Sequence, residues 1–534
     1  MDVESIPSTV PEALAAAERR FGDHEAIVDG DVRLTYRELA RQARRFARAL
    51  LARGVARGDR AAIWAPNGWE WVVAALGTLE IGAVLVTVNT RYLGAEARDL
   101  LSRSRARVLV VADGFLDKDY VGMLRDADDA LAADRPVATL ADLEVIVSTG
   151  RVPDVPGVVG FESWLATGDE IDESQVARAA HAVSGEDPCD VLFTSGTTGA
   201  PKGAVCGHAQ NLRTLVAWAQ SVGLREGDRY LMVNPFFHTF GYKAGILASV
   251  LHGATMLPLP ALDVDEVMRL AEREAATVLP GPPALYTSLL EHPDRRGRRL
   301  GQVRLAVTGA ASVPRTLIER IREELGIRDV VTAYGLTESC GVVTACSLDD
   351  DAETIATRCG TPIPDVEIRT VDQDGNDVGP DEPGEVLVRG PNVMQGYLDD
   401  PDATAAAIDR DGWLHTGDIG VIDERGYLRI TDRLKDMFIV GGFNVYPAEV
   451  EQVLTGHDAV AEAAVIGVPD DRLGEVGRAY VIPRQGRMVE EEELIDVCRE
   501  RLANFKVPRS VVVVDELPRN AAGKVLKREL AVRS

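Results

Sequence analysis

The run Thr194-Ser-Gly-Thr-Thr-Gly-Ala-Pro-Lys-Gly203 contains the residue types that hold phosphate groups, and it follows the apolar stretch Val191-Leu-Phe193. Glycines let successive backbone N–H groups turn inward, hydroxyls add donors, and an ammonium adds positive charge. The pattern therefore predicts a phosphate-binding loop after a strand, although a solvent-exposed turn has a similar composition. It is not a Walker loop, because its lysine follows a proline. The candidate residues are Thr194, Ser195, Gly196, Thr197, Thr198, Gly199 and Lys202.

Lysine is rare in this chain, which has seven lysines against 51 arginines. A chain so biased toward arginine keeps lysine where a compact point charge on a flexible stem is needed. This bias serves as a filter that draws attention to Lys202, Lys243, Lys435 and Lys524.

Two further segments carry carboxylates beside glycine and threonine. Tyr334-Gly-Leu-Thr-Glu338 follows the strand-like stretch Asp329 to Thr332, and Thr416-Gly-Asp418 comes later in the chain. A hard cation prefers carboxylate and phosphate oxygens together, so Glu338 is a candidate metal ligand. Taken alone, Glu338 is more typical of a surface carboxylate that caps a turn, and Asp418 of an Asp in a turn.

Several motifs in series resemble the adenylate-forming superfamily, which contains acyl-CoA synthetases, peptide-synthetase adenylation domains and beetle luciferases. Besides the glycine-rich loop they are Leu34-Thr-Tyr-Arg-Glu-Leu39, Pro235-Phe-Phe-His238, Tyr334-Gly-Leu-Thr-Glu338, Thr416-Gly-Asp418, Asp432-Arg-Leu-Lys-Asp436 and Asn520-Ala-Ala-Gly-Lys524. The resemblance covers nearly the whole chain. It implies an AMP-forming acid–thiol ligase that uses ATP, Mg²⁺ and coenzyme A.

The resemblance also implies the residues that hold the nucleotide. Tyr334, beside Gly335, would stack on adenine, Thr337 would meet the α-phosphate, and Glu338 would hold Mg²⁺ with Thr194. Asp418 would accept hydrogen bonds from both ribose hydroxyls, as an acidic residue does in dinucleotide folds. The remaining implied contacts come from Gly309, Ala310 and Ala311 beside the adenine and acyl group, and from Arg433 at the ribose and phosphate.

Lys524 is the residue expected to carry the first half-reaction. Attack of a carboxylate on the α-phosphate builds negative charge, which a positioned ammonium stabilises in the transition state. The alternative is a flexible lysine near the end of the chain. By resemblance, the C-terminal domain then rotates about a hinge at Lys435. Gly441 and Gly442 would next border a narrow pantetheine tunnel, although an ordinary turn explains them too.

The acyl pocket is expected near His238, Gly309, Tyr242 and Lys243. A lone histidine is more often structural, so only the position of His238 in its motif selects it as a candidate catalytic residue beside the acyl group. Lys243 in this segment suggests a polar acid, and a salt-bridged or surface lysine is the competing interpretation. The stretches Asn234 to Leu247 and Leu279 to Pro283 resemble actinobacterial enzymes of steroid breakdown. Those enzymes activate a propanoate on the bicyclic C/D-ring fragment.

Elements that position these residues follow from periodicity. Helical patterns at 37–53, 69–81 and 95–104 alternate with extended runs at 60–64, 83–88 and 107–111, which is typical of a mostly parallel sheet covered by helices. The pattern weakens at 112–185, which is expected to be connecting structure, and resumes until about residue 345. Short strands at 360–432 predict an antiparallel subdomain. The fold class is therefore α/β: an N-terminal domain (1–432) with helix-covered sheets and a small β-barrel-like subdomain, and a small mobile α+β C-terminal domain (433–534).

Composition narrows the range of partners. The net charge of −26 makes nucleic acid and anionic membranes poor partners, so the expected partners are a carboxylic acid, ATP and CoA. Val72 to Val88 is too broken to span a membrane, and no secretory signal is evident. Six dispersed cysteines indicate a reducing, cytoplasmic compartment. A homodimer is compatible with the resemblance.

Four alternatives stay open. The enzyme could load a separate carrier protein instead of CoA, or it could be a ligase for medium- or long-chain fatty acids. A luciferase-like monooxygenase would need an oxygen-handling site that the sequence does not indicate. A catalytically dead binding protein would be expected to lack Lys202, Glu338, Asp418 or Lys524, and all four are present.

Overall fold

The structure is a computed structural model that divides into two compact units. The first unit contains Met1–Glu367 and Val388–Leu414, and the second contains Ile368–Leu387 and His415–Ser534. The predicted domain boundary between residues 432 and 433 stays a prediction. The described residues are 6–126, 136–194, 201–294, 300–309, 313–433, 436–440, 443–445, 447–470, 473–502, 504–519 and 525–532.

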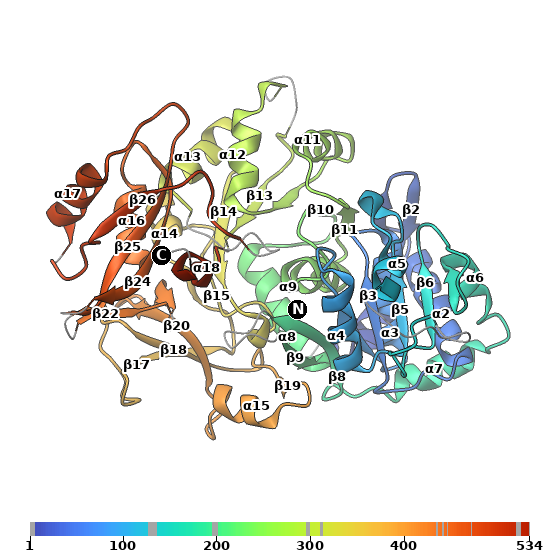
Figure 1. The fold of residues 1–534 in the computed structure, drawn as a ribbon. Coiled ribbons are helices and arrows are strands. Elements are labelled where there is room, and N and C mark those ends of the chain that lie inside the picture. The colour runs from blue at the N-terminus through green and yellow to red at the C-terminus, as the bar shows by residue number, and fades with distance from the viewer. Residues whose placement is uncertain are drawn as a thin grey trace. The chain divides into compact units, whose positions relative to one another are not determined.

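An eight-stranded sheet in the first unit has the order β19-β9-β8-β4-β3-β5-β6-β7 (Figure 1). Neighbouring strands from β8 to β7 along this order are parallel, whereas β9 runs antiparallel to both β8 and β19. The strands are β3 (Arg60–Trp64), β4 (Val84–Thr87), β5 (Val108–Val111), β6 (Val145–Ser148), β7 (Val158–Gly160), β8 (Pro188–Thr194), β9 (Lys202–Gly207) and β19 (Gly396–Tyr397).

A nine-stranded sheet in the same unit has the order β16-β15-β14-β13-β12-β10-β11-β1-β2. It is parallel from β14 to β1 and antiparallel at both edges. The strands are β1 (Glu25–Asp29), β2 (Val32–Thr35), β10 (Arg229–Met232), β11 (Thr255–Pro258), β12 (Val278–Pro280), β13 (Leu305–Thr308), β14 (Asp329–Tyr334), β15 (Thr344–Ala345) and β16 (Thr361–Pro362). The two sheets confirm the predicted mostly parallel, helix-covered architecture.

Helices flank these sheets (Figure 1). Within the described ranges, none of them is both long and apolar enough to cross a bilayer. The helices are α1 (Val10–Phe21), α2 (Tyr36–Ala52), α3 (Trp69–Glu80), α4 (Gly94–Ser104), η2 (Phe115–Asp117), α5 (Tyr120–Asp126), α6 (Phe161–Ala166), α7 (Glu173–His181), α8 (His208–Val222), α9 (Thr239–Gly241), η3 (Tyr242–Leu247), α10 (Ala248–His252), α11 (Val264–Arg273), α12 (Pro283–Glu291), α13 (Arg315–Glu324), η5 (Thr337–Ser339), α14 (Ala352–Thr357) and α15 (Pro401–Ala407).

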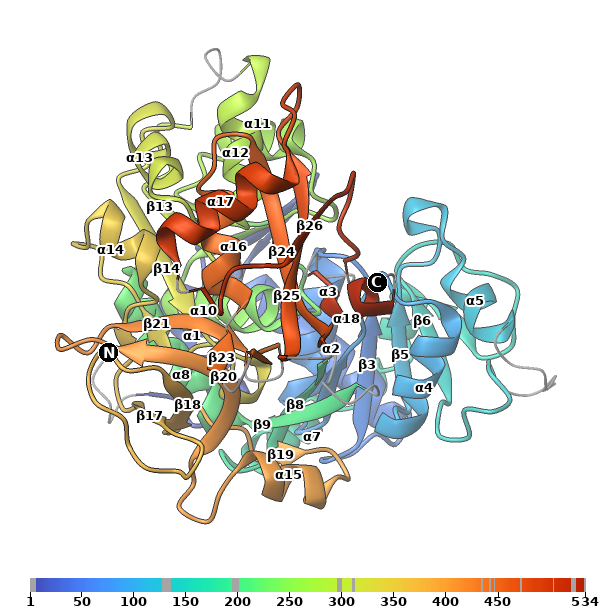
Figure 2. The same ribbon diagram turned by 60° about the vertical axis from the view of Figure 1, so that its left-hand side comes forward.

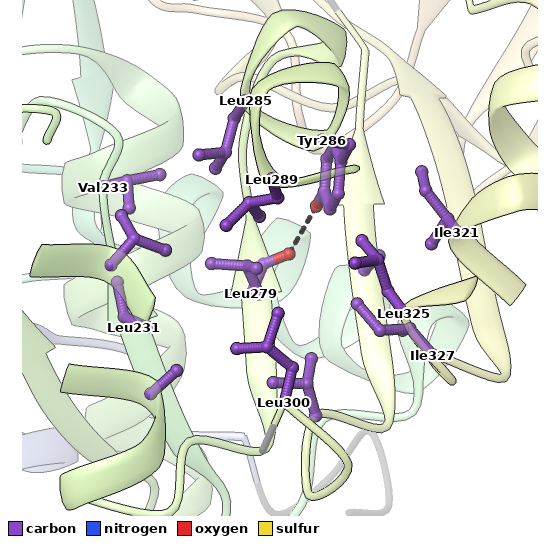
Figure 3. Close-up of a cluster of buried hydrophobic side chains, with 14 of the residues drawn as sticks. Leu231, Val233, Leu279, Leu285, Tyr286, Leu289, Leu300, Ile321, Leu325 and Ile327 are labelled. Atoms are coloured by element: carbon purple, nitrogen blue, oxygen red, sulfur yellow. Dashed lines mark hydrogen bonds between the residues drawn. The ribbon is translucent and has the colours of Figure 1, made fainter. Parts of the chain in front are cut away.

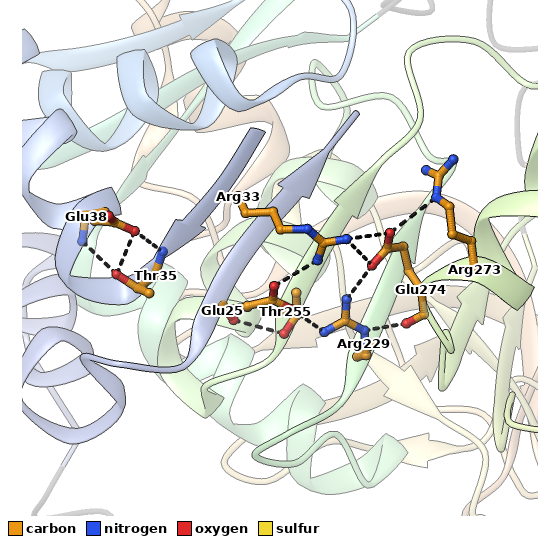
Figure 4. Close-up of polar contacts among 8 residues, drawn as sticks. All are labelled: Glu25, Arg33, Thr35, Glu38, Arg229, Thr255, Arg273 and Glu274. Carbon is orange, nitrogen blue, oxygen red and sulfur yellow. Dashed lines mark hydrogen bonds and ion pairs between the residues drawn. The ribbon is translucent and has the colours of Figure 1, made fainter. Parts of the chain in front are cut away.

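The motif Leu34-Thr-Tyr-Arg-Glu-Leu39 is a helix start. Thr35 is the N-cap of α2: its hydroxyl accepts from the Glu38 backbone N–H, and the Glu38 carboxylate accepts from the Thr35 backbone N–H (Figure 4). This reciprocal capping satisfies backbone donors that would otherwise lack partners. The Tyr36 hydroxyl is bonded to the carbonyl oxygens of Ser249 and Ala254. The motif thus anchors α2 to the segment that precedes β11.

Side chains of β10, β12 and β13 and of helices α11, α12 and α13 form one apolar core (Figure 3). Within it the Tyr286 hydroxyl donates to the Leu279 carbonyl oxygen at 2.6 Å, so this buried hydroxyl has a partner. At the sheet edge, Glu25 and Glu274 each pair with both Arg33 and Arg229, at 2.7 to 2.9 Å (Figure 4). Hydrogen bonding from Arg229 lowers the pKa of the Glu25 carboxyl. This network ties the β1–β2 hairpin to β10.

The second unit contains two smaller sheets. The first has the order β17-β18-β20-β21 and forms the predicted short-stranded subdomain. The second has the order β23-β22-β25-β24, with β26 beside β25, and α16, α17 and α18 pack on its strands (Figure 2). The elements are β17 (Glu367–Val371), β18 (Gly384–Arg389), β20 (Leu414–Ile422), β21 (Leu428–Arg433), β22 (Phe438–Val440), β23 (Phe443–Val445), α16 (Pro447–Thr455), β24 (Val460–Asp470), β25 (Gly474–Pro483), α17 (Glu491–Arg501), β26 (Ser510–Val513) and α18 (Lys527–Val532).

Segment 112–185 is more ordered than the sequence predicts. It supplies β6 and β7, which complete the eight-stranded sheet, together with the short helices α5, α6 and α7. Both strands lie in a stretch rich in Asp, Ala and Gly, where the alternation of helical and extended patterns is hard to recognise.

Candidate active site

The glycine-rich run is the connection between two antiparallel strands. Thr194, the last residue of β8, is paired with Lys202, the first residue of β9. The Thr194 hydroxyl lies 3.4 Å from the Lys202 carbonyl oxygen, and Arg103 of α4 donates to the Pro201 carbonyl oxygen at 2.6 Å. The strands therefore hold both ends of the predicted phosphate loop, whose residues 195–200 lie outside the described part of the chain.

The segment Tyr334 to Glu338 is a tight turn after β14. A side-chain carbon on Gly335 would lie 2.3 Å from the Gly341 carbonyl oxygen, so only glycine fits there. The Ser339 hydroxyl accepts from the Leu336 backbone N–H at 2.9 Å and donates to the Leu336 carbonyl oxygen. These contacts close the short helix η5, which contains Thr337 and Glu338.

The Glu338 carboxylate receives hydrogen bonds from two other elements. Its Oε1 accepts from the Thr194 hydroxyl at 3.4 Å and from the Tyr397 hydroxyl of β19 at 3.0 Å. Lys202 places its ammonium 5.1 Å from the centre of the Tyr397 ring. Burial, followed by the neighbouring charge of Glu338, raises the pKa of the Tyr397 hydroxyl. The structure thus brings Thr194, Lys202 and Glu338 together around one tyrosine.

Tyr397 is a site residue that the sequence analysis missed. It lies in a two-residue strand and in none of the motifs considered, and its partners are far away in the sequence. Its register opposite Ala204 of β9 is a tertiary feature without a local signal.

The oxygen ligands gathered here fit a hard cation. Thr194 and Glu338 were both predicted to hold Mg²⁺, and the structure brings their side chains within hydrogen-bonding distance although 144 residues separate them. Mg²⁺ prefers oxygen ligands, so carboxylate and hydroxyl oxygens beside a phosphate loop are suitable ligands for it. The assignment of the metal itself stays a prediction.

Asp418 and Arg433 belong to the second unit. They lie opposite each other at the open end of the β20–β21 hairpin. Asp418 is 3% exposed, and its backbone N–H donates to the Thr416 hydroxyl at 3.1 Å. The hairpin therefore pairs the backbones of the two residues predicted to meet the ribose.

Among the residues predicted to border the acyl group, His238 is exposed and caps α9. Its Nδ1 accepts from the Phe240 backbone N–H at 3.3 Å, so the imidazole has a structural partner. Tyr242 begins the π-helix η3, and its buried hydroxyl lies 3.8 Å from the Cys189 sulfur. Gly309 directly follows β13. Their contacts with an acid stay predictions.

Lys243 is 1% exposed and forms a 3.0 Å ion pair with Asp190 of β8, which is fully buried. Asn211 of α8 donates to the other Asp190 oxygen at 2.6 Å. Burial alone would lower the pKa of Lys243, but the charge of Asp190 outweighs it and raises the pKa well above its usual value. This buried pair is the salt-bridged alternative that the sequence left open for Lys243.

Several predicted residues lie outside the described part of the chain. They are Ser195, Gly196, Thr197, Thr198, Gly199, Ala310, Ala311, Lys435, Gly441, Gly442 and Lys524.

Comparison with known proteins identifies the family. The model of the AMP-binding enzyme family matches residues 14–398, and the model of the AMP-binding enzyme C-terminal domain matches residues 449–524. Two relatives, from Rhodococcus jostii and Mycobacterium tuberculosis, are 51% and 53% identical, and each alignment covers 98% of both chains. Both are named as CoA ligases of a propanoyl group on a 7a-methyl-1,5-dioxo-octahydroindene.

A mitochondrial medium-chain acyl-CoA ligase of Rattus norvegicus is 33% identical and aligns with 99% of this chain and 88% of its own length. Among solved structures, an anthranilate CoA ligase in complex with anthranoyl-AMP superposes with a TM-score of 0.85 at 28% identity, covering 100% of this chain and 99% of its own. The chain therefore belongs to the AMP-binding enzyme family of adenylate-forming proteins and is an acyl-CoA ligase, which uses ATP and CoA.

Proposed function

We propose that this ligase activates a propanoate carried on a methylated bicyclic diketone, the C/D-ring fragment left by steroid breakdown. The proposal rests on a difference in sequence identity between two kinds of relative. Two ligases named for this acid are 51% and 53% identical, whereas a medium-chain acyl-CoA ligase is 33% identical. The fatty-acid alternative is therefore the weaker one.

The reaction has two half-reactions. The carboxylate oxygen attacks the α-phosphorus of ATP, which forms acyl-AMP and releases pyrophosphate. The CoA sulfur then attacks the acyl carbonyl carbon, which forms the thioester and releases AMP, and the thiol proton leaves to solvent. Each step forms one bond and breaks one, so no oxidant or reductant is needed.

The first half-reaction is assigned to the cluster around Glu338. Thr194 and Glu338 would hold Mg²⁺, Lys202 and the loop at 194–199 would hold phosphates, and Tyr334, Gly335 and Thr337 would contact the base and α-phosphate. A bound Mg²⁺ would neutralise charge on phosphate oxygens. The 3.4 Å contact between the Thr194 hydroxyl and the Glu338 carboxylate supports this assignment. The further contacts would come from Gly309, Ala310 and Ala311 and, in the second unit, from Asp418 and Arg433.

Lys524 would stabilise the charge that builds on the α-phosphate during adenylation. The backbone at Lys435 would then absorb the conformational change that replaces Lys524 by Gly441 and Gly442 for the second half-reaction. His238, Tyr242 and Gly309 would border the acyl group. For Lys243 we keep a supporting role only, because its ammonium is already paired with Asp190.

We also propose a cytoplasmic enzyme. All six cysteines are free, which suits a reducing compartment. A homodimer stays a prediction that sedimentation can test.

The test is an incubation with ATP, Mg²⁺ and single acids, with and without CoA, in which all products are resolved by mass. We expect AMP, pyrophosphate and the CoA thioester with the bicyclic propanoate. Formation of adenylate that CoA never accelerates would favour a carrier protein as acceptor. A thioester only with fatty acids would refute the proposed acid and leave the ligase class intact.

A further inference from the structure

Backbone hydrogen bonds tie the segment around Tyr397 to the start of β9, beside Lys202, and to Glu338. Its neighbour Leu398 donates a backbone N–H to the Gly203 carbonyl oxygen at 2.8 Å, directly after Lys202. On the other side, the Met394 backbone N–H donates to the Glu338 carbonyl oxygen at 2.8 Å. Backbone hydrogen bonds alone therefore fix the short segment 394–398 to Glu338 and to Gly203, the residue that follows Lys202.

The side chain of Tyr397 contacts those two residues with different parts. Its hydroxyl donates to Glu338 Oε1 at 3.0 Å, and the ammonium of Lys202 lies over its ring. Oppositely charged groups that share a neighbour would be expected to pair. In the part of the chain that the structure describes, no ion pair joins Lys202 to Glu338, and the Tyr397 side chain contacts the carboxylate of Glu338 and the ammonium of Lys202.

We propose that Tyr397 is a positioning residue that keeps Glu338 and Lys202 apart and oriented, the carboxylate toward the cation and the ammonium toward phosphate. The inference rests on the proposed roles of these two residues. A direct Lys202–Glu338 pair would satisfy both charges without a ligand, so metal and nucleotide would have to break it. The aromatic ring offers the ammonium a weaker partner that a phosphate can replace.

The hydroxyl has a separate task. Carboxylates that bind metals are usually hydrogen-bonded by an outer partner that fixes their orientation, and loss of that partner typically costs about 10- to 100-fold in metal affinity or activity. The Tyr397 hydroxyl is such a partner for Glu338. It donates to Oε1 and makes no hydrogen bond to Oε2.

The first test is Tyr397→Phe in the full-length enzyme, which removes the hydroxyl and keeps the ring. We expect the Mg²⁺ concentration for half-maximal adenylation to rise about 10- to 100-fold. A readout without turnover is Mn²⁺ binding to the enzyme–ATP complex, followed by electron paramagnetic resonance, which should weaken by the same factor. Binding of AMP without metal should be unchanged.

Tyr397→Leu is the second variant, because it removes both the hydroxyl and the ring. We expect it to show the same metal defect and also weaker binding of metal-free ATP, since Lys202 can then pair with Glu338. The matched control is Tyr427→Phe in the β20–β21 turn, where Arg425 lies over the tyrosine ring at 4.8 Å. That variant should bind Mn²⁺ and ATP as the wild type does.

The proposal is overturned if Tyr397→Phe keeps wild-type Mn²⁺ affinity and Mg²⁺ half-saturation, whether or not its maximal rate falls. It is also overturned if Tyr397→Leu binds metal-free ATP as tightly as Tyr397→Phe. A wild type that adenylates no acid, or does so without Mg²⁺, would instead reject the proposed roles of Glu338 and Lys202.

Discussion

Two lysines of this lysine-poor chain place their ammonium groups in different surroundings. Lys243 is paired with Asp190 inside the first unit, where its ammonium is sealed from water. Lys202 stands at the start of β9, partly exposed, with an aromatic ring as its neighbour. A sealed pair suits a structural role, whereas a partly exposed cation beside a glycine-rich loop suits an exchangeable ligand.

The pair of Lys243 and Asp190 predicts a double-mutant result. Lys243→Met or Asp190→Asn alone should lower the free energy of unfolding by about 3–5 kcal/mol, because each change breaks a buried pair. The double variant should lose less than the sum of the two. Urea titration of the four proteins measures this. Strictly additive losses would mean that the two side chains do not stabilise each other.

Lys524 carries a kinetic prediction. Lys524→Ala should slow formation of acyl-AMP by about 10²- to 10³-fold, the cost of removing one group that stabilises transition-state charge. Conversion of chemically supplied acyl-AMP to the CoA thioester should stay within about twofold, because that step does not use the lysine. Rapid-quench assays of each half-reaction separate the two. Equal loss in both would contradict the assignment.

At the residue scale, sequence patterns identify functional side chains that lie in contiguous motifs. Thr194 and Glu338 could be assigned because each belongs to a recognisable motif, and the structure then placed them side by side. Tyr397 and Asp190 could not be assigned, since their partners come from distant strands. Their roles depend on the register of β19 against β9 and on the packing of η3 against β8, which no local pattern encodes.

At the scale of elements, agreement is best where the hydrophobic pattern is regular. The 17-residue helix α2 was expected at 37–53 and runs over Tyr36–Ala52, and β3 was predicted at its observed bounds, Arg60–Trp64. Long amphipathic helices and β-branched runs carry a period that can be read. Strands β6 and β7 complete the sheet, but the stretch around them is rich in Asp, Ala and Gly and does not show the regular alternation seen in the first 111 residues.

The junction of α1 and α8 should make stability depend on pH. His208 begins α8, is fully buried, and its Nδ1 accepts from the Val10 backbone N–H of α1 at 3.2 Å. Burial lowers the pKa of His208 to about 4, against 6.5 in an unfolded chain. Between these values the unfolded chain binds more protons, so the contribution of His208 is present above pH 6.5 and is lost as the pH falls.

The expected loss is about 3 kcal/mol on going from pH 6.5 to pH 4. The measurement is the difference in unfolding free energy between wild type and His208→Gln at several pH values. That difference should shrink in favour of the variant as the pH falls. A difference that does not change with pH would rule out a neutral buried imidazole.

At the scale of the whole molecule, the position of the domain boundary can be tested by truncation. Residues 1–432 keep β17, β18, β20 and nearly all of β21, whereas residues 1–414 lose the last two strands and leave β18 without a neighbour on that side. The longer fragment should fold and bind AMP but not form adenylate, because Lys524 is absent. The shorter fragment should aggregate through its open strand edge. Calorimetry and size-exclusion chromatography compare them, and equal behaviour would argue against a boundary at residue 432.

The most direct test of the central claim is the specificity of the intact enzyme. We would measure kcat/KM for CoA thioester formation with the bicyclic diketone propanoate and with octanoate. A pocket built for a polar bicyclic acid should favour it by about 100-fold or more, since a site that hydrogen-bonds its substrate rejects analogues that lack those groups. An equal or higher value for octanoate would contradict the proposed substrate and make this chain a fatty-acid ligase.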